Sequence, residues 1–507
     1  MTGWPEKLVM VLHNAKAKEL ASPDSFLGDK PASSPHPYSK PPKSTMGSNS
    51  AEQEGSHVVT IWEVDKERLA QMEKRISETT PQLLRIAAGR SGCCIFRVPH
   101  NLIDINGEWY QPRIVSIGPY HRGQPNLQMM EEHKWRYLRS LLSRTKEAKG
   151  ITLEDYLKSI HPLEKDAREC YSETIHLGTD EFLETMVLDG CFILELFRKV
   201  DNTNLFDPED PLVTNLFDPE DPLVTMSWIL PFFYRDFLRL ENQIPFFVLE
   251  RLFEISKTPD EESGPSLSLL AMRFFNNSME RPDEVIESCN NLKGLHLLDL
   301  VRSSFIPQGE KSPPHKVDTP THIIHCVSKL RSSGIKLNQA KKAEESFLVV
   351  KFRRGVIEMP SITIDDFMSS LLLNCVAFEQ CHSSSSMHFT TYTTFLDCLV
   401  NTARDVEYLC DRNIIENYFG NDAEVARLIN NMGKDVAFDT NLSYLSQLFN
   451  DVHQYYRNSW HVQWASFKYT YFDTPWSFIS AMAALVLLVL AFLQTFFTIE
   501  PYVNRKH

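Results

Sequence analysis

The chain has 507 residues, of which 42% are hydrophobic and 23% are charged, and its formal net charge is −14. These proportions are ordinary for a globular protein, and the length is sufficient for a large buried core. The excess of 66 acidic over 52 basic residues argues against a nucleic-acid-binding surface, because neutralising phosphates requires clustered lysine and arginine. We therefore expect no nucleic-acid partner and a chain that folds over most of its length.

The ten cysteines are scattered, mostly within apolar segments, and they form no C-x-x-C pair. This pattern is typical of buried free thiols in a reducing compartment rather than of a disulfide framework. The first 20 residues also do not resemble a secretory signal, because charges closely flank their short apolar stretch at residues 8–12. The main domain is therefore predicted to lie in the cytosol.

The composition divides the chain into four parts. Residues 1–56 are predicted to be a disordered N-terminal extension, since residues 22–56 carry six prolines and many serines. Residues 57–473 are predicted to form one domain, which is mainly α with small β-hairpin elements and has a loop insertion at 201–226. Residues 474–499 are predicted to be a transmembrane helix, and residues 500–507 a short tail.

Apolar residues that recur every three or four positions predict the main helices. They lie at 130–142, 182–197, 395–410 and 425–436, and a charged helix is predicted at 62–78. Asn421 and Glu424 predict a capping box at the start of the helix at 425–436. Asp365 and Asp366 predict the start of another helix, as acidic residues at a helix N-terminus.

Strands are predicted in two segments. Residues 347–364 alternate like a pair of strands with a turn near Arg354 and Gly355. Residues 94–118 mix β-branched residues with prolines, and Asn106-Gly107 is their strongest turn signal. We expect short strands and turns in both.

Three segments read as surface loops, because they are rich in proline, serine and charge: 201–226, 257–265 and 307–320. The first contains NLFDPEDPLVT twice without a difference, at 204–214 and 215–225. The repeat indicates either a recent local duplication that lengthens a loop or an error in the gene model.

The predicted membrane span contains no charged residue from Thr474 to Ile499. Its 24-residue core, 476–499, would be roughly 36 Å long as a helix, which is enough to cross a hydrocarbon layer of about 30 Å. A buried core helix is the alternative, but such helices are usually shorter and include charges. The flanking charges are balanced and leave the orientation open. The residues expected to contact lipid are Trp476, Phe478, Leu485, Leu490 and Phe497.

Known catalytic and cofactor motifs are absent from the sequence: there is no P-loop, G-x-S-x-G, H-E-x-x-H or dinucleotide fingerprint. His322, His325 and Cys326 lie close together, but no second ligand pair follows at a suitable spacing, which favours ordinary helix-face residues over a metal site. Nothing near Cys93 and Cys94 lowers a thiol pKa. We therefore predict no catalytic residue, no metal and no cofactor.

Two polar motifs invite a second interpretation. GPYHRG at 118–123 has the composition of an anion contact, yet a tight turn that uses its glycines is the simpler explanation. Its candidate residues are Gly118, Pro119, Tyr120 and His121. Glu241, Asn242 and Gln243 precede an apolar helix, where helix capping explains them without a ligand.

Several long motifs resemble the plant family called "domain of unknown function 247". They are CCIFRVPHNLIDINGEWYQPRIVSIGPYHRG, MVLDGCFILELF, LRLENQIPFFVLERLF, HLLDL, GVIEMPSITIDDFMSSLLLNCVAFEQC and YFDTPWSFISAMAAL, and the resemblance runs in order from about residue 62 to residue 499. It implies a helical protein with one C-terminal transmembrane segment. The resemblance implies no catalytic or ligand residue, because none is established for the family. Some grass members of the family are implicated in pollen self-incompatibility.

Two classes of function remain open at this point. The first is a single-pass, tail-anchored protein that recognises or scaffolds a protein partner, with the plasma membrane as one candidate membrane. The second is an uncharacterised enzyme whose active site is assembled from residues distant in sequence. The lack of any catalytic motif favours the first.

Overall fold

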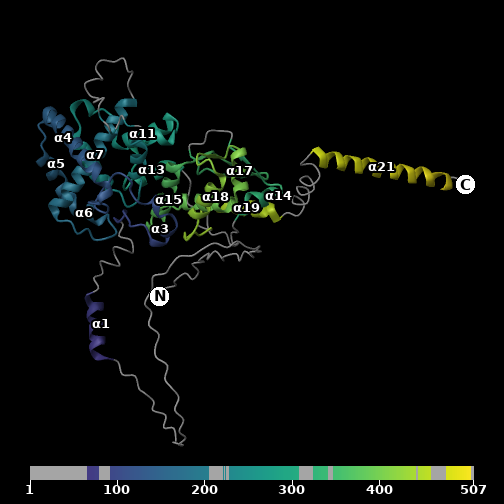
Figure 1. Ribbon diagram of the computed structural model, residues 1–507, viewed down its shortest axis with the longest axis horizontal. Coiled ribbons are helices and arrows are strands. Elements are labelled where there is room, and N and C mark those ends of the chain that lie inside the picture. The colour runs from purple at the N-terminus through teal and green to yellow at the C-terminus, as the bar shows by residue number, and fades with distance from the viewer. Residues whose placement is uncertain are drawn as a thin grey trace, which may run out of the picture. The chain divides into compact units, whose positions relative to one another are not determined.

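The structure is a computed structural model that describes residues 65–78, 92–204, 228–307, 324–340, 346–440, 443–457 and 475–503, together with residues 221, 223 and 226. It is mainly helical with two small sheets, which confirms the predicted fold class (Figure 1). The predicted disordered extension at 1–56 lies outside the described residues. Two compact units are distinguished, Met1–Leu83 and Leu84–His507.

The described part of the first unit is helix α1 (Lys66–Glu78), which confirms most of the charged helix predicted at 62–78. Asp65 starts it by accepting hydrogen bonds from the backbone amides of Glu67 and Arg68. All residues from 65 to 74 are exposed.

Residues 92–307 form the helical part of the domain. Its helices are α3 (His100–Asn106), α4 (Gln128–Lys149), α5 (Leu153–Ile160), α6 (Glu164–Glu169), α7 (Thr179–Asn204), α9 (Leu230–Asp236), α10 (Phe246–Ser256), α11 (Leu267–Met279), α12 (Asp283–Glu287) and α13 (Leu297–Phe305). Helix α7 is central, because α4, α5, α10 and α11 all pack against it. Its apolar positions from Phe182 to Phe197 are buried, as the spacing predicts.

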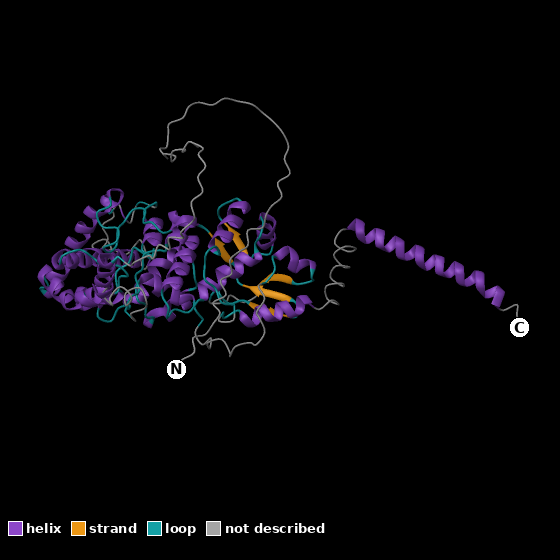
Figure 2. Ribbon diagram, turned by 90° about the horizontal axis from the view of Figure 1, so that it is seen from below, coloured by secondary structure: helices purple, strands orange, loops and turns teal. Residues whose placement is uncertain are grey.

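Residues 324–457 contain all the described strands. The elements are α14 (Val327–Ser332), β1 (Lys336–Gln339), β2 (Lys351–Arg353), β3 (Val356–Met359), β4 (Ile362–Ile364), α15 (Asp366–Cys381), α16 (His388–Leu399), α17 (Ala403–Asp411), β5 (Ile415–Asn417), α18 (Asp422–Met432) and α19 (Ser446–Arg457). Strand β3 lies between β1, to which it is parallel, and β2, to which it is antiparallel. Strands β4 and β5 form a separate parallel pair. Figure 2 shows the strands enclosed by helices.

The predicted hairpin is confirmed, with β2 and β3 joined at Arg354 and Gly355. The predicted start of α15 is also confirmed, since the Asp365 carboxylate accepts a 2.7 Å hydrogen bond from the amide of Met368. Asn421 caps α18 as expected, but it bonds the amide of Ala423 at 2.9 Å instead of forming the reciprocal box with Glu424.

The strand prediction for 94–118 is wrong apart from one isolated bridge between Ile95 and Tyr171. After Pro99 the chain forms α3, and Gly107 continues it as a 3₁₀ turn with a helical φ of −53°. Leu102 and Asn106 lie four residues apart and are both buried, so one face of this short helix joins the core. Burial of that face outweighs the local turn signal at Asn106-Gly107.

The helix predicted at 395–410 is in fact two helices, α16 and α17. The break occurs where Thr402 and Asp405 form a capping box: the Asp405 carboxylate accepts hydrogen bonds from the amide of Thr402 at 3.0 Å and from the amide of Asn401 at 3.2 Å. The apolar spacing continues across the break, which explains why periodicity alone joins the two helices.

Candidate functional site

Helix α21 (Pro475–Val503) is the long apolar helix at the C-terminal end of the described chain. Within the described ranges it is the one helix long and apolar enough to cross a membrane, over Ile479–Ile499, with a mean hydropathy of 2.4 and no burial. Those 21 residues extend about 32 Å, close to the thickness of a hydrocarbon core. The length and composition predicted for the span are therefore present in the structure.

The side chains of α21 are apolar on every side of the helix. Leu487, Leu488 and Phe492 are each about two-thirds exposed. More than half of each side chain is also exposed for the predicted lipid-facing residues Trp476, Leu485, Leu490 and Phe497. Phe478 lies on the same helix, and its side chain is outside the described part. The hydroxyls of Thr495 and Thr498 donate to the carbonyls of Ala491 and Gln494, so these polar groups are satisfied within the helix.

The two polar motifs of the domain meet each other in space. Gly118 has a φ of +74°, and its amide donates a 2.8 Å hydrogen bond to Oδ2 of Asp189 on α7. A Cβ at this position would lie 2.5 Å from the carbonyl oxygen of Gln243. Only glycine fits this backbone conformation and this close approach. The turn interpretation of GPYHRG agrees with this geometry, and Gly123 also has a positive φ, of +80°.

Asn242 and Gln243 hold the chain segments around them together. Oδ1 of Asn242 accepts from the amide of Ile117 at 2.7 Å, and its Nδ2 donates to the carbonyls of Val115 and Asp236. Nε2 of Gln243 donates to the carbonyls of Phe237 and Arg239. The capping interpretation is therefore wrong: α10 starts later, at Phe246, without a side-chain cap, and these buried amides satisfy backbone groups of the preceding turn at 236–239 and of the distant segment 115–117.

Glu241 forms the charged part of the same junction and is 3% exposed. It pairs with Arg97 at 2.7 Å and with Nε2 of His121 at 3.2 Å, and it accepts from the amide of Val98 at 2.8 Å. Burial alone would raise the pKa of Glu241, but the hydrogen bonds from His121, Val98 and Arg97 outweigh it and hold the pKa below its ordinary value. Glu241 is therefore ionised and fully engaged by its neighbours.

This junction does not resemble an open anion site. His121 is 1% exposed, and its Nδ1 is hydrogen-bonded to Nε2 of Gln124 at 2.9 Å. Tyr120 packs edge-on against Tyr171, and the guanidinium of Arg97 lies 4.1 Å from the centre of its ring. Pro119 lies between Gly118 and Tyr120 in the sequence of this turn. The polar groups of the motif thus face each other, and their evident role is to join segments 95–123 and 236–243.

Further buried charges extend this pattern. Lys134 on α4 donates to Asp189, to Glu131 and to the carbonyl of Ser116, which uses all three of its protons. Asp236 on α9 accepts from the consecutive amides of Arg113, Ile114 and Val115. The sequence analysis does not single out these residues. Asp189 does have a local signal, because it lies in the apolar run MVLDGCFILELF, whereas Lys134 directly follows Glu131, Glu132 and His133 and has none.

A second buried ion pair lies between α13 and α15. Nε of Arg302 is 2.9 Å from Oε1 of Glu379, and both side chains are almost fully buried. Glu379 also accepts from the amides of Phe389 and Thr390 at the start of α16. Burial raises the pKa of Glu379, and the charge of Arg302 opposes this increase.

His296 caps α13 through Nδ1, and its Nε2 donates to the carbonyl of Cys94, so its neutral tautomer is fixed. Burial lowers the pKa of His296 to about 4.

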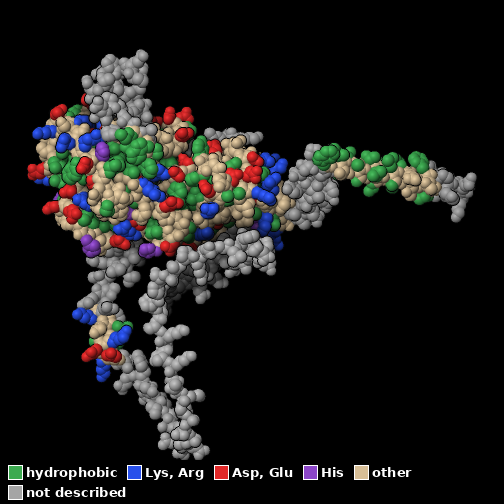
Figure 3. All heavy atoms as spheres, in the orientation of Figure 1, with side chains coloured by type: hydrophobic (Ala, Val, Ile, Leu, Met, Phe, Trp, Pro, Cys, Tyr) green, Lys and Arg blue, Asp and Glu red, His purple; other side chains and the backbone are tan. Residues whose placement is uncertain are grey.

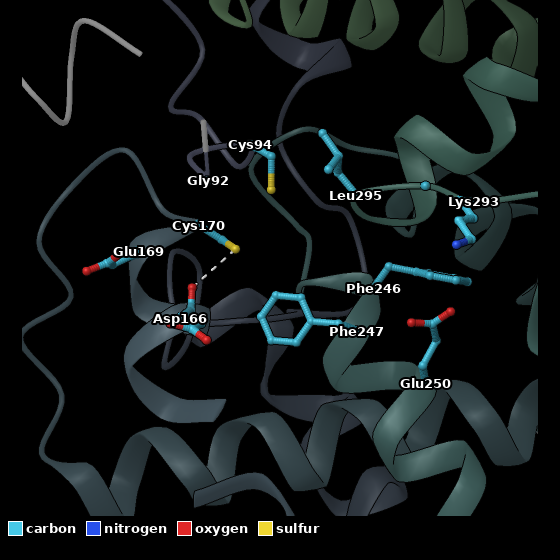
Figure 4. A pocket seen from close by; sticks show the side chains of 11 residues that line it. Gly92, Cys94, Asp166, Glu169, Cys170, Phe246, Phe247, Glu250, Lys293 and Leu295 are labelled. Carbon is cyan, nitrogen blue, oxygen red and sulfur yellow. Dashed lines mark hydrogen bonds between the residues drawn. The ribbon is translucent and has the colours of Figure 1, made fainter. Parts of the chain in front are cut away.

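An open pocket of about 380 Å³ lies between the start of the domain, α6 and α10 (Figure 4). Cys94 and Cys170 direct their sulfurs toward it, and Asp166, Glu250 and Lys293 are placed around it. A hydrogen bond with Cys170, and then burial, raise the pKa of the Cys94 thiol. The Cys94 thiol therefore stays protonated at neutral pH, and no histidine that would act as a base is among the residues that line the pocket.

No metal site is found within the described ranges, where no group of three or more histidine, cysteine or acidic side chains is suitably placed. Of the cluster considered above, His325 and Cys326 precede α14, and the ring of His325 lies against that of Tyr456. His322 lies outside the described residues.

Comparisons with known proteins identify a family and two relatives of the chain. The chain matches the family DUF247, described as "Plant protein of unknown function", over residues 95–490. It is 36% identical to the UPF0481 protein At3g47200 of Arabidopsis thaliana, over 84% of this chain and 90% of that protein. It is 22% identical to the putative UPF0481 protein At3g02645 of the same plant, over 79% of this chain and 89% of that protein.

No solved structure matches the chain. The family match covers the buried junction, the second ion pair and most of α21. The chain therefore belongs to the plant DUF247 family, also named UPF0481, whose description assigns no function.

Proposed function

We propose that the protein is held in a membrane by α21 as a single-pass C-terminal anchor, with the domain on the cytosolic side. The observation that carries the anchor is a 21-residue apolar helix with no part buried. Leucine, isoleucine and phenylalanine at the centre of a span each favour insertion by roughly 0.3–0.6 kcal/mol, whereas the same side chains are unfavourable in water.

The cytosolic placement rests on the thiols. All ten cysteines lie within the described residues and none forms a disulfide there, although Cys94 and Cys170 line the same pocket. Free thiols persist in a reducing compartment, whereas neighbouring cysteines tend to be oxidised outside it. A domain in the cytosol faces the cytosolic leaflet of the membrane.

The test is to compare the full chain with a chain that lacks residues 475–507, expressed in plant cells. The full chain should stay in membranes washed with alkaline carbonate, and the shortened chain should be soluble with an unchanged melting temperature. Leu485→Arg with Leu490→Arg should release the chain as well, because charged side chains at the centre of a span are unfavourable. Leu485→Ala with Leu490→Ala is the matched control. A shortened chain that remained in washed membranes would refute the anchor.

The orientation has its own test. A glycosylation sequon added after His507 should carry a glycan if the domain is cytosolic, because the tail would then lie in the lumen. The natural sequon at Asn441 should carry none. The sequon at Asn276 is a poor reporter, because its side chain already bonds the backbone of Arg281 through both Nδ2 and Oδ1. A glycan on Asn441 would place the domain on the opposite side.

We further propose that the anchored domain binds a protein partner. The favouring observation is an apolar groove of about 450 Å³ between α4, α5 and α7, lined by Leu138, Leu157 and Val187. Trp135 is 48% exposed at its rim, and Leu153 is 39% exposed. Exposed aromatic and aliphatic side chains around a groove are typical of protein contacts. The loops at 201–226 and 307–320, which are predicted to lie on the surface and whose composition would also suit recognition, lie largely outside the described residues.

Trp135→Ser with Leu153→Ser should abolish capture of a specific partner from native membranes, while melting temperature and membrane retention stay unchanged. Met129→Ser is the control, because Met129 is equally exposed on α4 and does not line the groove. Retention of the same partners by the groove variant would refute this site. The competing enzyme hypothesis would be favoured if a change in the pocket of Figure 4, such as Glu250→Gln, altered a small-molecule product in cells.

A further inference from the structure

Exposed basic residues without an ion pair, such as Arg139 and Lys165, occur in residues 92–307 as well as in residues 324–457, but in the second part four of them lie around one turn. In residues 92–307, arginines and lysines from many elements pair with acids of other elements, as Arg97 does with Glu241 and Arg144 with Glu195. In residues 324–457 several basic residues stay in solvent. Lys336, Arg353, Arg354 and Arg457 are all exposed, and within the described part of the chain none of the four forms an ion pair.

These four residues lie around the Arg354-Gly355 turn, where Lys336 and Arg353 are on one face of the sheet and α19 packs against the other face, and we call them the basic edge. Lys336 on β1 and Arg353 on β2 are both paired with Val356 on the strand between them, so their side chains lie on the same face of the sheet. The amide of Lys336 donates to the carbonyl of Gly355, which places β1 next to the Arg354-Gly355 turn. Glu358 is an acid on the same face, opposite Lys351.

Helix α19 brings the fourth residue to this edge. It packs against β2, where the rings of Phe352 and Tyr455 meet edge-on at 5.9 Å. Gly355 lies so close that a Cβ there would be 2.6 Å from the ring of Tyr455. Arg457, two residues further on, therefore ends α19 beside the hairpin turn. Figure 3 shows lysine and arginine side chains gathered at the end of the domain where Figure 1 labels α14.

The proposed membrane anchor follows the basic edge in the sequence. Helix α19 ends at Arg457 and α21 begins at Pro475, a difference of 18 positions. Eighteen steps from residue to residue of about 3.4 Å each limit the distance between Arg457 and Pro475 to at most about 60 Å. The sequence thus connects the domain to its proposed anchor at Arg457, which is one of these exposed basic residues, on a protein whose overall charge is −14.

We propose that the basic edge, Lys336, Arg353, Arg354 and Arg457, binds the anionic headgroups of the membrane that holds α21. This inference rests on the proposed membrane anchor. Each lysine or arginine near an anionic leaflet favours binding by about 1 kcal/mol, or about fivefold. The interaction fades within a Debye length of about 8 Å in physiological salt, so it requires the edge to lie against the surface. Docking of the edge would fix which side of the domain faces the lipid.

Connectivity favours lipid over a soluble polyanion as the occupant. A surface tethered within about 60 Å of a bilayer meets headgroups at a high effective concentration, whereas a soluble acidic partner gains nothing from the tether. The four charges also come from three elements that share a folded sheet and helix, so their arrangement is fixed before binding and costs little ordering entropy.

The experiment measures how fast Lys336 is acylated in the full chain reconstituted into vesicles. One set of vesicles is pure phosphatidylcholine, and in the other about a third of the lipid is phosphatidylserine. Flotation first selects protein that is inserted. Acylation of Lys336, read by mass spectrometry, should be at least about threefold slower in the anionic vesicles and should recover in about 0.5 M NaCl. Lys158, which is 70% exposed on α5, should react equally in both.

Variants sharpen the result. Arg353→Gln with Arg354→Gln and Arg457→Gln should remove the protection of Lys336. The control removes the same charge from three other exposed residues, with Arg139→Gln, Lys146→Gln and Lys165→Gln, and should retain the protection.

Failure of this proposal and failure of the anchor are distinguishable. A chain that does not float with the vesicles overturns the anchor and this inference with it. A chain that floats, but whose Lys336 reacts equally in both lipids, overturns the inference alone. Protection of Lys336 by soluble heparin, without protection by phosphatidylserine, would assign the edge to a soluble polyanion and also overturn it.

Discussion

The domain and α21 distribute polar and apolar side chains in opposite ways. The domain buries charged groups such as Glu241, Asp236 and Glu379 and satisfies each with backbone amides or a paired base. Helix α21 exposes leucine and phenylalanine on all sides. Buried polar groups that are fully bonded specify how segments join, whereas exposed apolar groups require another phase or partner to cover them. These buried charges of the domain thus serve the fold, whereas the exposed surface of α21 contains almost no charged side chain.

The largest expected effect tests whether the buried charges are structural. Arg302→Met leaves Glu379 buried without its base, which should lower the free energy of unfolding by about 3–5 kcal/mol. Lys158→Met breaks an ion pair whose side chains are 70% and 73% exposed. That control should cost at most about 1 kcal/mol. Chemical denaturation in detergent micelles measures both. Equal stability of the two variants would mean that the buried pair is dispensable.

The next prediction concerns the junction of the two motifs. Gly118→Ala should destabilise the domain by about 2–4 kcal/mol, because the new methyl group meets the Gln243 carbonyl and the backbone keeps a positive φ. Gly123 has the same backbone strain but no atom within 4 Å of its Cβ position. Gly123→Ala should therefore cost only about 1–2 kcal/mol. The folded fraction of each variant should remain in the membrane, because neither substitution changes α21. Similar losses for the two glycines would contradict the close approach.

A pH dependence follows from His296. Its pKa in the folded domain, about 4, is below the ordinary value of 6.5. Between these two values the unfolded chain binds a proton that the folded domain does not, so the stability falls as the pH is lowered from 6.5 to 4. The loss from this group should approach about 3 kcal/mol.

His296→Asn removes that titration and keeps an oxygen to cap α13. The difference in unfolding free energy between the wild type and this variant should therefore shrink as the pH falls, and parallel pH profiles would exclude His296 as the cause. The membrane association of α21, which carries no histidine, should not follow this profile.

The smallest effect is expected for the duplicated segment. Asp221 and Leu223 in the second copy are buried, and Asp221 pairs with Arg136 and Lys199. Removing 215–225 leaves the first copy directly before Met226, so its Asp210 and Leu212 take the same positions relative to Met226. The free energy of unfolding should change by less than about 1 kcal/mol, because only the loop length differs. By contrast, Leu223→Ala with Leu212→Ala should be clearly destabilising. A large loss on deletion would show that both copies are packed.

Some features follow directly from local chemistry and were predicted from the sequence. The apolar run at 475–499 lies in helix α21, because its composition and length favour no other structure in an apolar phase. Asp365 and Asn421 mark helix starts through bonds to amides two or three residues away. The hairpin at Arg354-Gly355 and the periodic face of α7 are also local patterns. Each requires only neighbours in the chain.

Other features were decided only by tertiary contacts. Glu241 contacts Arg97 and His121, which lie more than a hundred residues away in the sequence. Because the local pattern contains neither partner, it predicts a helix cap at Glu241 instead. Residues 100–109 became helical because one face is buried, and α16 and α17 separated where Thr402 and Asp405 satisfy the backbone. The basic edge has no signal in the sequence, since register and packing bring Lys336, Arg354 and Arg457 together. Local bonds fix where elements start and end, but long-range partners decide what a buried polar residue is for.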